Sequence, residues 1–168
     1  MLSIARNLGQ LSFGKLMEVY LEANRENGAE LAPDETEERQ LQLAEEDFYA
    51  YLHDSFFKKP DAVYYIWEEA GNYVSALRLE PYRDGLLLEA LETAPKRRRQ
   101  GYATRLMNAV LFTLSEQGSV CVYSHVSKKN IPSLKTHQHC GFQIISDYAA
   151  YIDGSVNHRA YTLQYKKT

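Results

Sequence analysis

Residues 86–106 read LLLEALETAPKRRRQGYATRL, and this stretch decides the fold. Its first six residues are mostly apolar and predict a buried strand. A basic turn follows, and Gly101 and Ala103 then open a predicted helix over residues 100–117. The first turn of a helix presents N–H groups without intrahelical acceptors and the positive end of the helix dipole. Small residues there let the backbone approach an anion, so the stretch predicts an anion-binding junction.

The basic turn over residues 96–99 adds positive charge beside this junction. Taken alone, four adjacent basic residues are also typical of a solvated turn or of a nucleic-acid patch. The formal net charge of -3 and the single basic cluster argue against nucleic acid as a partner. The position of the turn, directly before a helix, favours the anion site.

The sequence before this stretch predicts a short edge strand over residues 1–8 and then two helices. Ser12 is the expected N-cap of the first helix, and Asn27-Gly28 its expected end. A second helix starts at Pro33 and Asp34 and carries an apolar stripe as far as Phe56. Its opposite face is acidic, which indicates either a solvated face or a lip that attracts a cationic amine.

Three strands, over residues 63–67, 73–79 and 86–91, are joined by turns and predict an antiparallel meander. A strand over residues 120–126 follows the helix, which implies a parallel crossover. A short helix over residues 131–139, closed by Gly141, precedes a final hairpin of residues 142–151 and 158–165. The fold class is therefore α+β, with a central twisted, mostly antiparallel sheet, a parallel crossover and flanking helices.

The 168 residues fit one domain, residues 1–168, which is long enough to bury a core without metals or disulfides. Neither a signal peptide nor an apolar run long enough to span a bilayer is present, so no membrane partner is expected. Two cysteines, Cys121 and Cys140, indicate a reducing compartment. We therefore expect a cytoplasmic protein.

The pattern Arg98-x-x-Gly101-x-Ala103 resembles the acetyl-CoA signature of the GNAT superfamily of N-acetyltransferases, in which Arg or Gln, Gly, and Gly or Ala have this spacing. The predicted order of helices and strands is also similar to that of the family. Residues 130–142, from Asn130 to Gly141-Phe142, are similar to its second motif, an asparagine followed by a helix that ends in Gly-Phe. The resemblance covers essentially the whole chain and is strongest over residues 86–142.

The resemblance implies acetyl-CoA as cosubstrate and direct transfer of its acetyl group to a primary amine. It places the pyrophosphate on backbone N–H groups of residues 99–104 and the pantetheine arm along residues 91–93, where two strands splay apart. The cofactor-binding residues that it implies are Leu91, Glu92, Thr93, Arg98, Arg99, Gln100, Gly101, Tyr102, Ala103, Thr104, Asn130 and Ser133. It leaves the acceptor open among small metabolites, antibiotics, polyamines and protein N-termini, and it is compatible with a homodimer.

Catalysis of this kind requires a base for the ammonium group, a donor for the thioester oxygen and a proton for the leaving thiolate. Glu89 is the candidate base because it interrupts an apolar strand; a solvated or paired carboxylate is the alternative, and Glu92 is the fallback. Strict alternation predicts that Glu89 shares a face with Leu87 and Leu91, whose neighbourhood offers a backbone N–H to the thioester.

His137 stands where many relatives carry a tyrosine, and it is the candidate general acid or else an ordinary polar helix residue. The missing tyrosine supports a second hypothesis, an acyl-CoA-binding sensor with weak or no turnover. Tyr148 and Tyr151, on the predicted last hairpin, either line the acceptor pocket or supply a phenol, or they pack on the sheet. The spacing of His137, His139 and Cys140 fits no tetrahedral zinc pattern, so no metal site is predicted.

Overall fold

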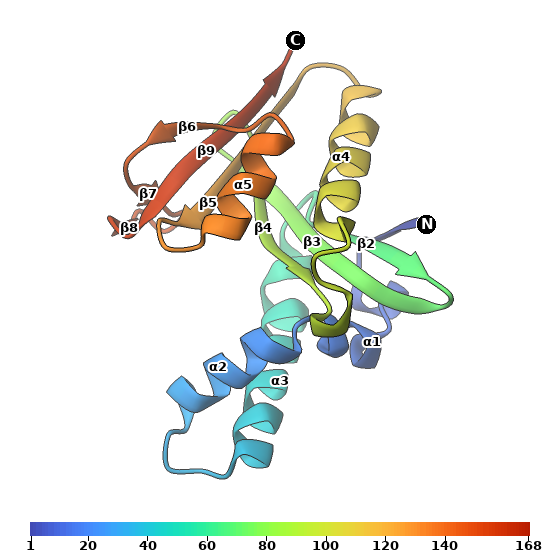
Figure 1. The fold of residues 1–168 in the computed structure, drawn as a ribbon, viewed down its shortest axis with the longest axis vertical. Coiled ribbons are helices and arrows are strands. Elements are labelled where there is room, and N and C mark those ends of the chain that lie inside the picture. Colours follow the sequence, from blue (N-terminus) through green and yellow to red (C-terminus); the bar gives the residue numbers. More distant parts are fainter.

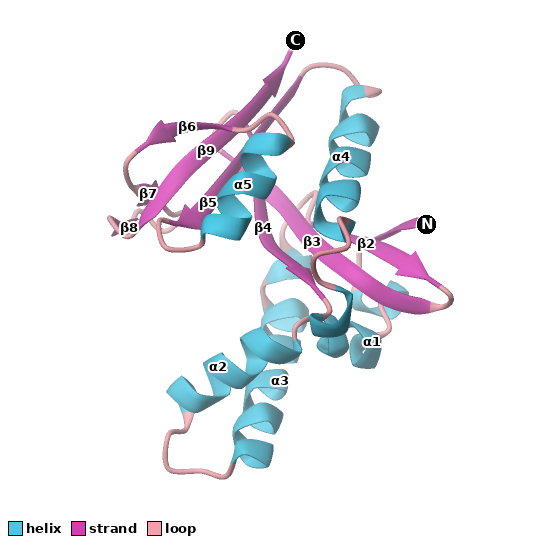
Figure 2. Cartoon of the chain, in the orientation of Figure 1, coloured by secondary structure: helices cyan, strands magenta, loops and turns pink.

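A seven-stranded sheet runs through the molecule in the order β1-β2-β3-β4-β5-β9-β6, and β4 and β5 form its single parallel pair. The computed structural model describes all residues, 1–168. Helices cover both faces of the sheet, while α2 and α3 form an antiparallel pair that projects away from it (Figures 1 and 2). The predicted fold class, a mixed sheet with one parallel crossover and flanking helices, is confirmed.

The helices and strands have the following bounds. The helices are α1 Phe13–Val19, α2 Leu21–Leu31, α3 Glu37–Asp54, α4 Tyr102–Ser115 and α5 Ile131–His139, with 3-10 turns at Leu8–Gln10, Phe56–Lys58 and Pro95–Arg97. The strands are β1 Leu2–Ala5, β2 Val63–Glu69, β3 Asn72–Tyr82, β4 Gly85–Thr93, β5 Val120–Ser127, β6 Gln143–Ser146, β7 Ala149–Ala150, β8 Val156–Asn157 and β9 Ala160–Lys167.

Two apolar layers sandwich the first half of the sheet because side chains alternate along each strand. Val63 and Tyr65 of β2 face α4 and join the larger core, which also holds the buried stripe Leu106, Met107, Val110 and Leu111 of α4. Tyr64 and Ile66 face the other way, onto α1 and α3. The antiparallel meander β2-β3-β4 and the crossover β4-α4-β5 are both as predicted.

The first predicted helix has the wrong end, because Gly28 does not terminate it. The helix is broken at Tyr20 into α1 and α2, and α2 continues through Gly28 to Leu31. A Cβ on Gly28 would lie 2.3 Å from the carbonyl oxygen of Gln40, so glycine is needed there for α2 and α3 to pack closely. Ser12 does precede α1 but makes no side-chain capping hydrogen bond.

The last predicted hairpin is more elaborate than expected. β6 pairs with β9 and β9 also pairs with β5, whereas residues 149–157 turn off into a separate two-stranded ribbon, β7-β8. β6 is thus an edge strand of the large sheet. No helix in the structure has both the length and the apolar character that crossing a membrane requires.

Candidate functional site

The parallel strands β4 and β5 pair over only three residues and then separate. Their register runs from Leu86 opposite Val122 to Leu88 opposite Ser124 and stops there. A cavity opens beyond this point and is bordered by both strands and by α5; its lining is Leu88, Glu89, Ala90, Leu91, Ser124, His125, Val126, Ser127, Asn130, Ser133 and His137. We call it the splay cavity. The predicted separation of these two strands is therefore present.

A β-bulge in β4 forms one wall of the splay cavity. Arg78 of β3 lies opposite Glu89 and Ala76 opposite Glu92, so two residues of β4 face one residue of β3. Ala90 has a φ of 52°, and its carbonyl oxygen accepts a hydrogen bond from the Tyr20 hydroxyl at 2.6 Å. The bulge changes the direction of β4 at Ala90. The hydrogen bond from Tyr20, which belongs to the layer of α1 and α3, stabilises this geometry.

The bulge makes the predicted alternation wrong at one position. Leu91 packs against the core on the α4 side together with Leu88, whereas Ala90 packs against the α1–α3 layer. Glu89 and Leu91 therefore do not share a face. Strict alternation failed because the extra residue of a bulge shifts every later side chain by one position.

A second cavity, the loop groove, lies at the start of α4. Gly101 is the N-cap residue with a φ of 79°, and no atom lies within 4 Å of the position its Cβ would take. The backbone N–H groups of residues 99–104 have no acceptor anywhere in the chain. Consecutive free N–H groups at a helix start are an anion site.

The loop groove gathers almost every predicted cofactor residue. Its lining is Leu91, Glu92, Thr93, Arg97, Arg98, Arg99, Gly101, Tyr102, Ala103, Thr104, Asn130, Pro132, Ser133 and Thr136. Gln100 is the exception, since its side chain bonds the carbonyl of Lys96 at 3.4 Å and does not line the groove. Asn130 caps α5 by accepting the Ser133 N–H at 3.1 Å, and both residues line the groove and the splay cavity.

The positive charge beside the groove is smaller than the sequence predicts, because two of the arginines pair within the chain. Arg97 bonds Glu69 and the Tyr102 hydroxyl. Arg98 bonds Glu22 of α2, and it lies 3.4 Å from Glu92 of β4. Lys96 and Arg99 have no ion pair. Internal carboxylates thus hold part of the basic turn in place.

Glu89 lies in the splay cavity with its carboxylate 3.4 Å from Nε of Arg78. Burial raises the pKa of Glu89 above its ordinary value, although the Arg78 guanidinium acts in the opposite direction. Arg78 itself lies over the rings of Tyr51 and Phe56. Glu89 is therefore both a paired carboxylate, as the alternative interpretation held, and a cavity residue with the raised pKa that suits a base.

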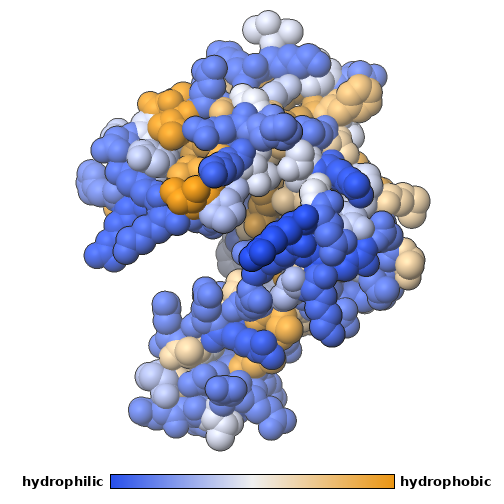
Figure 3. All heavy atoms as spheres, in the orientation of Figure 1, coloured by the Kyte–Doolittle hydropathy of each residue, from blue (hydrophilic) through white to orange (hydrophobic).

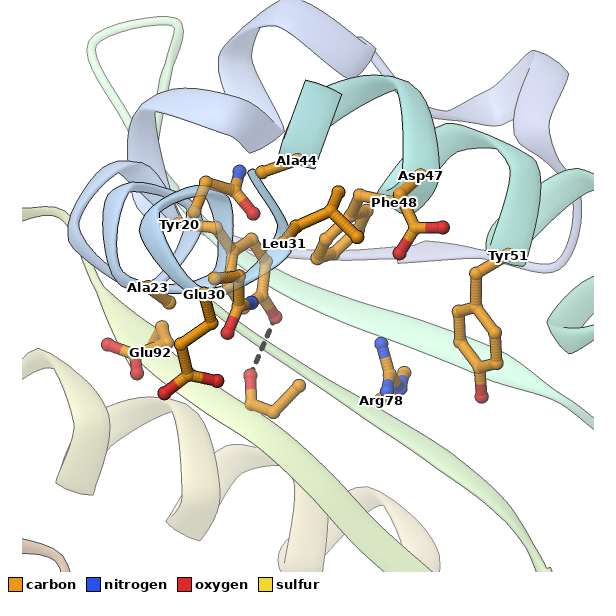
Figure 4. Close-up of a pocket in the computed structure, with 13 residues that line it drawn as sticks. Tyr20, Ala23, Glu30, Leu31, Ala44, Asp47, Phe48, Tyr51, Arg78 and Glu92 are labelled. Carbon is orange, nitrogen blue, oxygen red and sulfur yellow. Dashed lines mark hydrogen bonds between the residues drawn. The ribbon is translucent and has the colours of Figure 1, made fainter. Parts of the chain in front are cut away.

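A third cavity, the α2–α3 cleft, opens where the projecting helix pair meets β3 and β4 (Figure 4). Its volume is about 560 Å³, and its lining is Tyr20, Ala23, Asn24, Asn27, Glu30, Leu31, Ala44, Asp47, Phe48, Tyr51, Arg78, Ala90 and Glu92. The space-filling view shows the surface hollowed between the helix pair and the end of the molecule that contains α5 (Figure 3). Ala90 belongs also to the splay cavity and Glu92 also to the loop groove. Three cavities therefore meet at the bulge of β4.

A family model described as the acetyltransferase (GNAT) family matches residues 18–142, which include every lining residue of the loop groove, the splay cavity and the α2–α3 cleft. The chain belongs to this family. The resemblance of the motifs is thereby confirmed. No curated protein sequence matches the chain significantly.

Solved structures of acetyltransferases share the fold of this GNAT chain. The Escherichia coli ribosomal-protein-S18-alanine N-acetyltransferase is 14% identical, with a TM-score of 0.63 over 99% of this chain and 94% of that one. The aminoglycoside 6'-acetyltransferase type Ii is 16% identical, with a TM-score of 0.63 over 99% and 96%. The Thermoplasma acidophilum paia N-acetyltransferase, solved with coenzyme A, is 14% identical, with a TM-score of 0.63 over 99% of each chain. These likenesses establish the fold and leave the acceptor open.

His137, at the family's tyrosine position, is buried and hydrogen-bonded on both ring nitrogens. Nδ1 lies 2.8 Å from the carbonyl oxygen of Ser133, and since a carbonyl only accepts, Nδ1 carries the proton. Burial lowers the pKa of His137, so the ring is neutral and its Nε2 accepts from the Ser124 hydroxyl at 2.9 Å. In this arrangement His137 has no proton to donate into the cavity. The geometry favours a hydrogen-bond acceptor over the predicted general acid, and the catalytic role of His137 stays a prediction.

Tyr148 and Tyr151 line none of the three cavities that meet at β4. Tyr148 packs against His158, and Tyr151 lies edge-on to His125 at 5.1 Å. The aromatic walls of the α2–α3 cleft are instead Tyr20, Phe48 and Tyr51. The final hairpin thus does not bring its tyrosines to the site in this GNAT chain, because residues 149–157 leave the large sheet as a separate ribbon.

Sequence reasoning missed Ser124 and Asn24, two polar side chains that are almost completely buried. Ser124 falls within an apolar strand, and that interruption was the signal that could have found it. Asn24 has no such signal, since polar residues are ordinary on a helix with one exposed face. Cys140 is buried, and burial raises its pKa to about 11, so it carries a thiol at neutral pH.

Proposed function

We propose that the protein is an acetyl-CoA-dependent N-acetyltransferase that transfers an acetyl group directly to a primary amine. One observation carries the proposal: the groove of free N–H groups at α4, the splay of β4 and β5, and the α2–α3 cleft meet at one bulge. A donor held in the groove and an acceptor held in the cleft would approach each other at the splay. Such convergence is what a direct transfer requires.

The residues of the groove fit the cosubstrate. The free N–H groups of residues 99–104 offer hydrogen bonds to a pyrophosphate, and Gly101 leaves the space that a side chain would take. Arg98 and Arg99 line the same groove and add charge. Asn130 and Ser133 stand where the groove opens into the splay cavity. When bound, acetyl-CoA supplies an activated acetyl group as a thioester.

Glu89 is the proposed base, acting directly or through a water molecule. Its carboxylate lies in the splay cavity, next to the bulge at which the cleft and the splay cavity meet. A raised pKa makes it a stronger proton acceptor than an ordinary carboxylate. Glu92, the fallback, has a pKa that burial raises too, but it pairs with Arg98 and lies beyond the bulge.

Ser124 replaces His137 as the proposed donor to the leaving sulfur. Its hydroxyl contacts His137 Nε2 at 2.9 Å and the Leu88 carbonyl at 3.2 Å, at the last paired position before the strands separate. Rotation of this hydroxyl toward the splay cavity would let it donate a hydrogen bond to the leaving thiolate, which stabilises the developing charge while the serine keeps its proton. His137 positions the hydroxyl in the meantime.

His137 replaces the tyrosine of many relatives, and this replacement supports a second candidate function, an acyl-CoA-binding sensor with weak or no turnover. The observation in its favour is that His137 is held as an acceptor and carries no proton toward the cavity. Both functions need the loop groove, so acetyl-CoA binding alone does not separate them.

Calorimetric titration of the protein with acetyl-CoA, followed by thiol release with a panel of primary amines, tests the proposal. Binding together with thiol release on at least one amine supports the transferase. Binding without release on any amine supports the sensor. Absence of binding overturns both functions and makes the basic turn an ordinary solvated loop.

The proposal also extends to the surroundings of the enzyme. Free thiols at Cys121 and Cys140 support a reducing, cytoplasmic setting. Exposed apolar side chains on and next to the edge strand β6 support a homodimer through that edge; they are Ile144, Ile145, Tyr148, Ile152 and Val156. Sedimentation equilibrium measures the oligomeric state, and a monomer at micromolar concentration would remove this part of the proposal.

A further inference from the structure

The α2–α3 cleft is built for an acceptor of one chemical class. We infer that the acceptor is a small molecule with at least two ammonium groups joined by an apolar segment, one of which is acetylated while the other is held in the cleft. This inference rests on the proposed function and names the substrate class for it. The volume of about 560 Å³ is that of a small-molecule site.

Asn24 supplies the first observation. It is 1% exposed, and its side chain lines the cleft. The amide nitrogen donates to the Met17 sulfur at 3.3 Å, a weak acceptor. The amide oxygen accepts no hydrogen bond within the chain, and since no buried polar side-chain atom lacks a partner, this oxygen is open to the cleft. An acceptor that opens into an apolar and aromatic cleft gains when a ligand donates a hydrogen bond to it. An oxygen of this kind calls for an N–H donor, and an ammonium group is the strongest one.

The charge of the cleft supplies the second observation. Glu30 from α2 and Asp47 from α3 both line it, and neither takes part in an ion pair. Figure 4 shows these two carboxylates reaching out from the two different helices. Arg78 is the one cation in the lining, and Glu89 already faces it. The unpaired charge is therefore negative, and it favours a cation over a neutral or anionic ligand.

The remaining lining is apolar and aromatic. Leu31 and Phe48 lie between the two carboxylates in the close-up, and the ring of Tyr51 stands at one end (Figure 4). Aromatic faces attract ammonium groups, and the aliphatic surface suits a methylene chain. A compact monoamine would leave both the aromatic wall and the distant carboxylates without contacts.

The bulge defines the other end of the acceptor. Ala90 lines both the cleft and the splay cavity, so an amine that enters from the cleft meets Glu89 at this point. The second ammonium then remains in the cleft with Asn24, Glu30 and Asp47. The reacting amine gives its proton to the base, forms the new C–N bond and displaces the thiolate, while the second ammonium keeps its proton throughout.

Binding is tested first, because it does not depend on turnover. A series of linear α,ω-diamines and the monoamines of matching length are titrated into the protein saturated with coenzyme A. We expect the best diamine to bind at least about 10-fold more tightly than its monoamine, as a charged hydrogen bond contributes on that scale. Equal affinities, or no diamine binding, would overturn the inference.

Three variants locate the effect. The paired change Glu30→Gln with Asp47→Asn alters exposed side chains only and should remove the preference for the diamine. Glu35→Gln with Glu38→Gln removes the same charge from exposed positions outside the cleft and should retain it. Asn24→Leu keeps the side-chain volume and should weaken diamine binding, with circular dichroism to confirm folding. A preference that survives the first variant would sink the inference.

Thiol release with acetyl-CoA separates this inference from the proposed function. Release with diamines at a higher kcat/KM than with matched monoamines supports both. Release with monoamines or an alanine-terminated peptide at equal or higher kcat/KM retains the transferase and overturns the acceptor class. Absence of acetyl-CoA binding removes the proposed function, and the acceptor class falls with it.

Discussion

The guanidinium of Arg98 lies 3.4 Å from the carboxylate of Glu92, and Glu92 stands in the wall between the loop groove and the α2–α3 cleft. Arg98 also bonds Glu22 of α2. Arg98, the arginine of the acetyl-CoA signature, thus lines the loop groove and also pairs with the carboxylates of Glu22 and Glu92. A phosphate in the groove has to compete with these carboxylates for it.

This competition predicts that Glu92→Gln tightens acetyl-CoA binding. Removing the carboxylate frees Arg98 for the phosphates, and since the pair is partly exposed we expect a gain of about 2- to 5-fold in affinity. Glu22→Gln should act in the same direction. Titration calorimetry measures both, and the gain should shrink in high salt. Weaker binding in both variants would contradict the assignment of Arg98 to the phosphates.

Gly101→Val should weaken acetyl-CoA binding by at least about 10-fold. A β-branched side chain is strained at a φ of 79° and projects into the groove where the free N–H groups lie. Gly71→Val is the matched control, since Gly71 has a φ of 76° and equally open space but lies in the β2–β3 turn. We expect both variants to lose similar stability. Only Gly101→Val should lose affinity for acetyl-CoA. Unchanged affinity in Gly101→Val would remove the groove from the cosubstrate site.

Glu89→Gln should lower kcat/KM by about 100-fold or more, on the scale of a lost general base. The base works only when ionised, and burial raises its pKa, so kcat/KM should fall as the pH drops and should start to fall above the ordinary range of a glutamate. The residual activity of the variant should lack this acidic limb. Glu92→Gln should retain the fall of kcat/KM at low pH. If that fall were absent in Glu92→Gln and present in Glu89→Gln, Glu92 would be the base.

Ser124→Ala should reduce kcat by about 10- to 100-fold and leave the Kd of acetyl-CoA nearly unchanged, because the hydroxyl acts on the leaving sulfur. Thr162→Val is the control, since Thr162 is an equally buried hydroxyl on β9 that bonds Tyr148 outside the cavities. His137→Phe should reproduce part of the loss by releasing the Ser124 hydroxyl. If Ser124→Ala retained full kcat, a water molecule would be the better candidate for the donor.

Gly28→Ala should destabilise the protein by about 1–3 kcal/mol and raise KM for the acceptor. The added Cβ would lie 2.3 Å from the Gln40 backbone, so α2 and α3 would have to move apart at the cleft. Gly14→Ala, in α1, meets no atom within 4 Å and should be neutral or stabilising. Urea unfolding and acceptor kinetics measure the two effects. Equal stability of both variants would show that the helix pair tolerates the change.

The sequence predicted the loop groove well because its signals are local. A strand, a basic turn and a glycine at a helix start follow one another within residues 86–106, and their backbone geometry depends little on distant parts of the chain. The same holds for the cap of α5 at Asn130. These elements were sufficient to predict the acetyl-CoA signature and the mixed sheet.

Predictions that needed a side chain's surroundings were less successful. The direction of Leu91 depended on a bulge, and the protonation of His137 depended on its burial and on the Ser133 carbonyl. The lining of the cleft brings together residues of α2, α3, β3 and β4, with Asn24 and Glu92 far apart in sequence. Neither the bulge nor these contacts leave a periodic signal in the chain.

The sequence by itself therefore determined the order of the helices and strands, the strand-to-helix junction that opens with Gly101, and the family to which they belong, because hydrophobic periodicity and glycine placement act locally. Only the tertiary structure decided which acids and hydroxyls work at the site. The raised pKa of Glu89 and the lowered pKa of His137 both arise from burial, and burial exists only once the layers have packed.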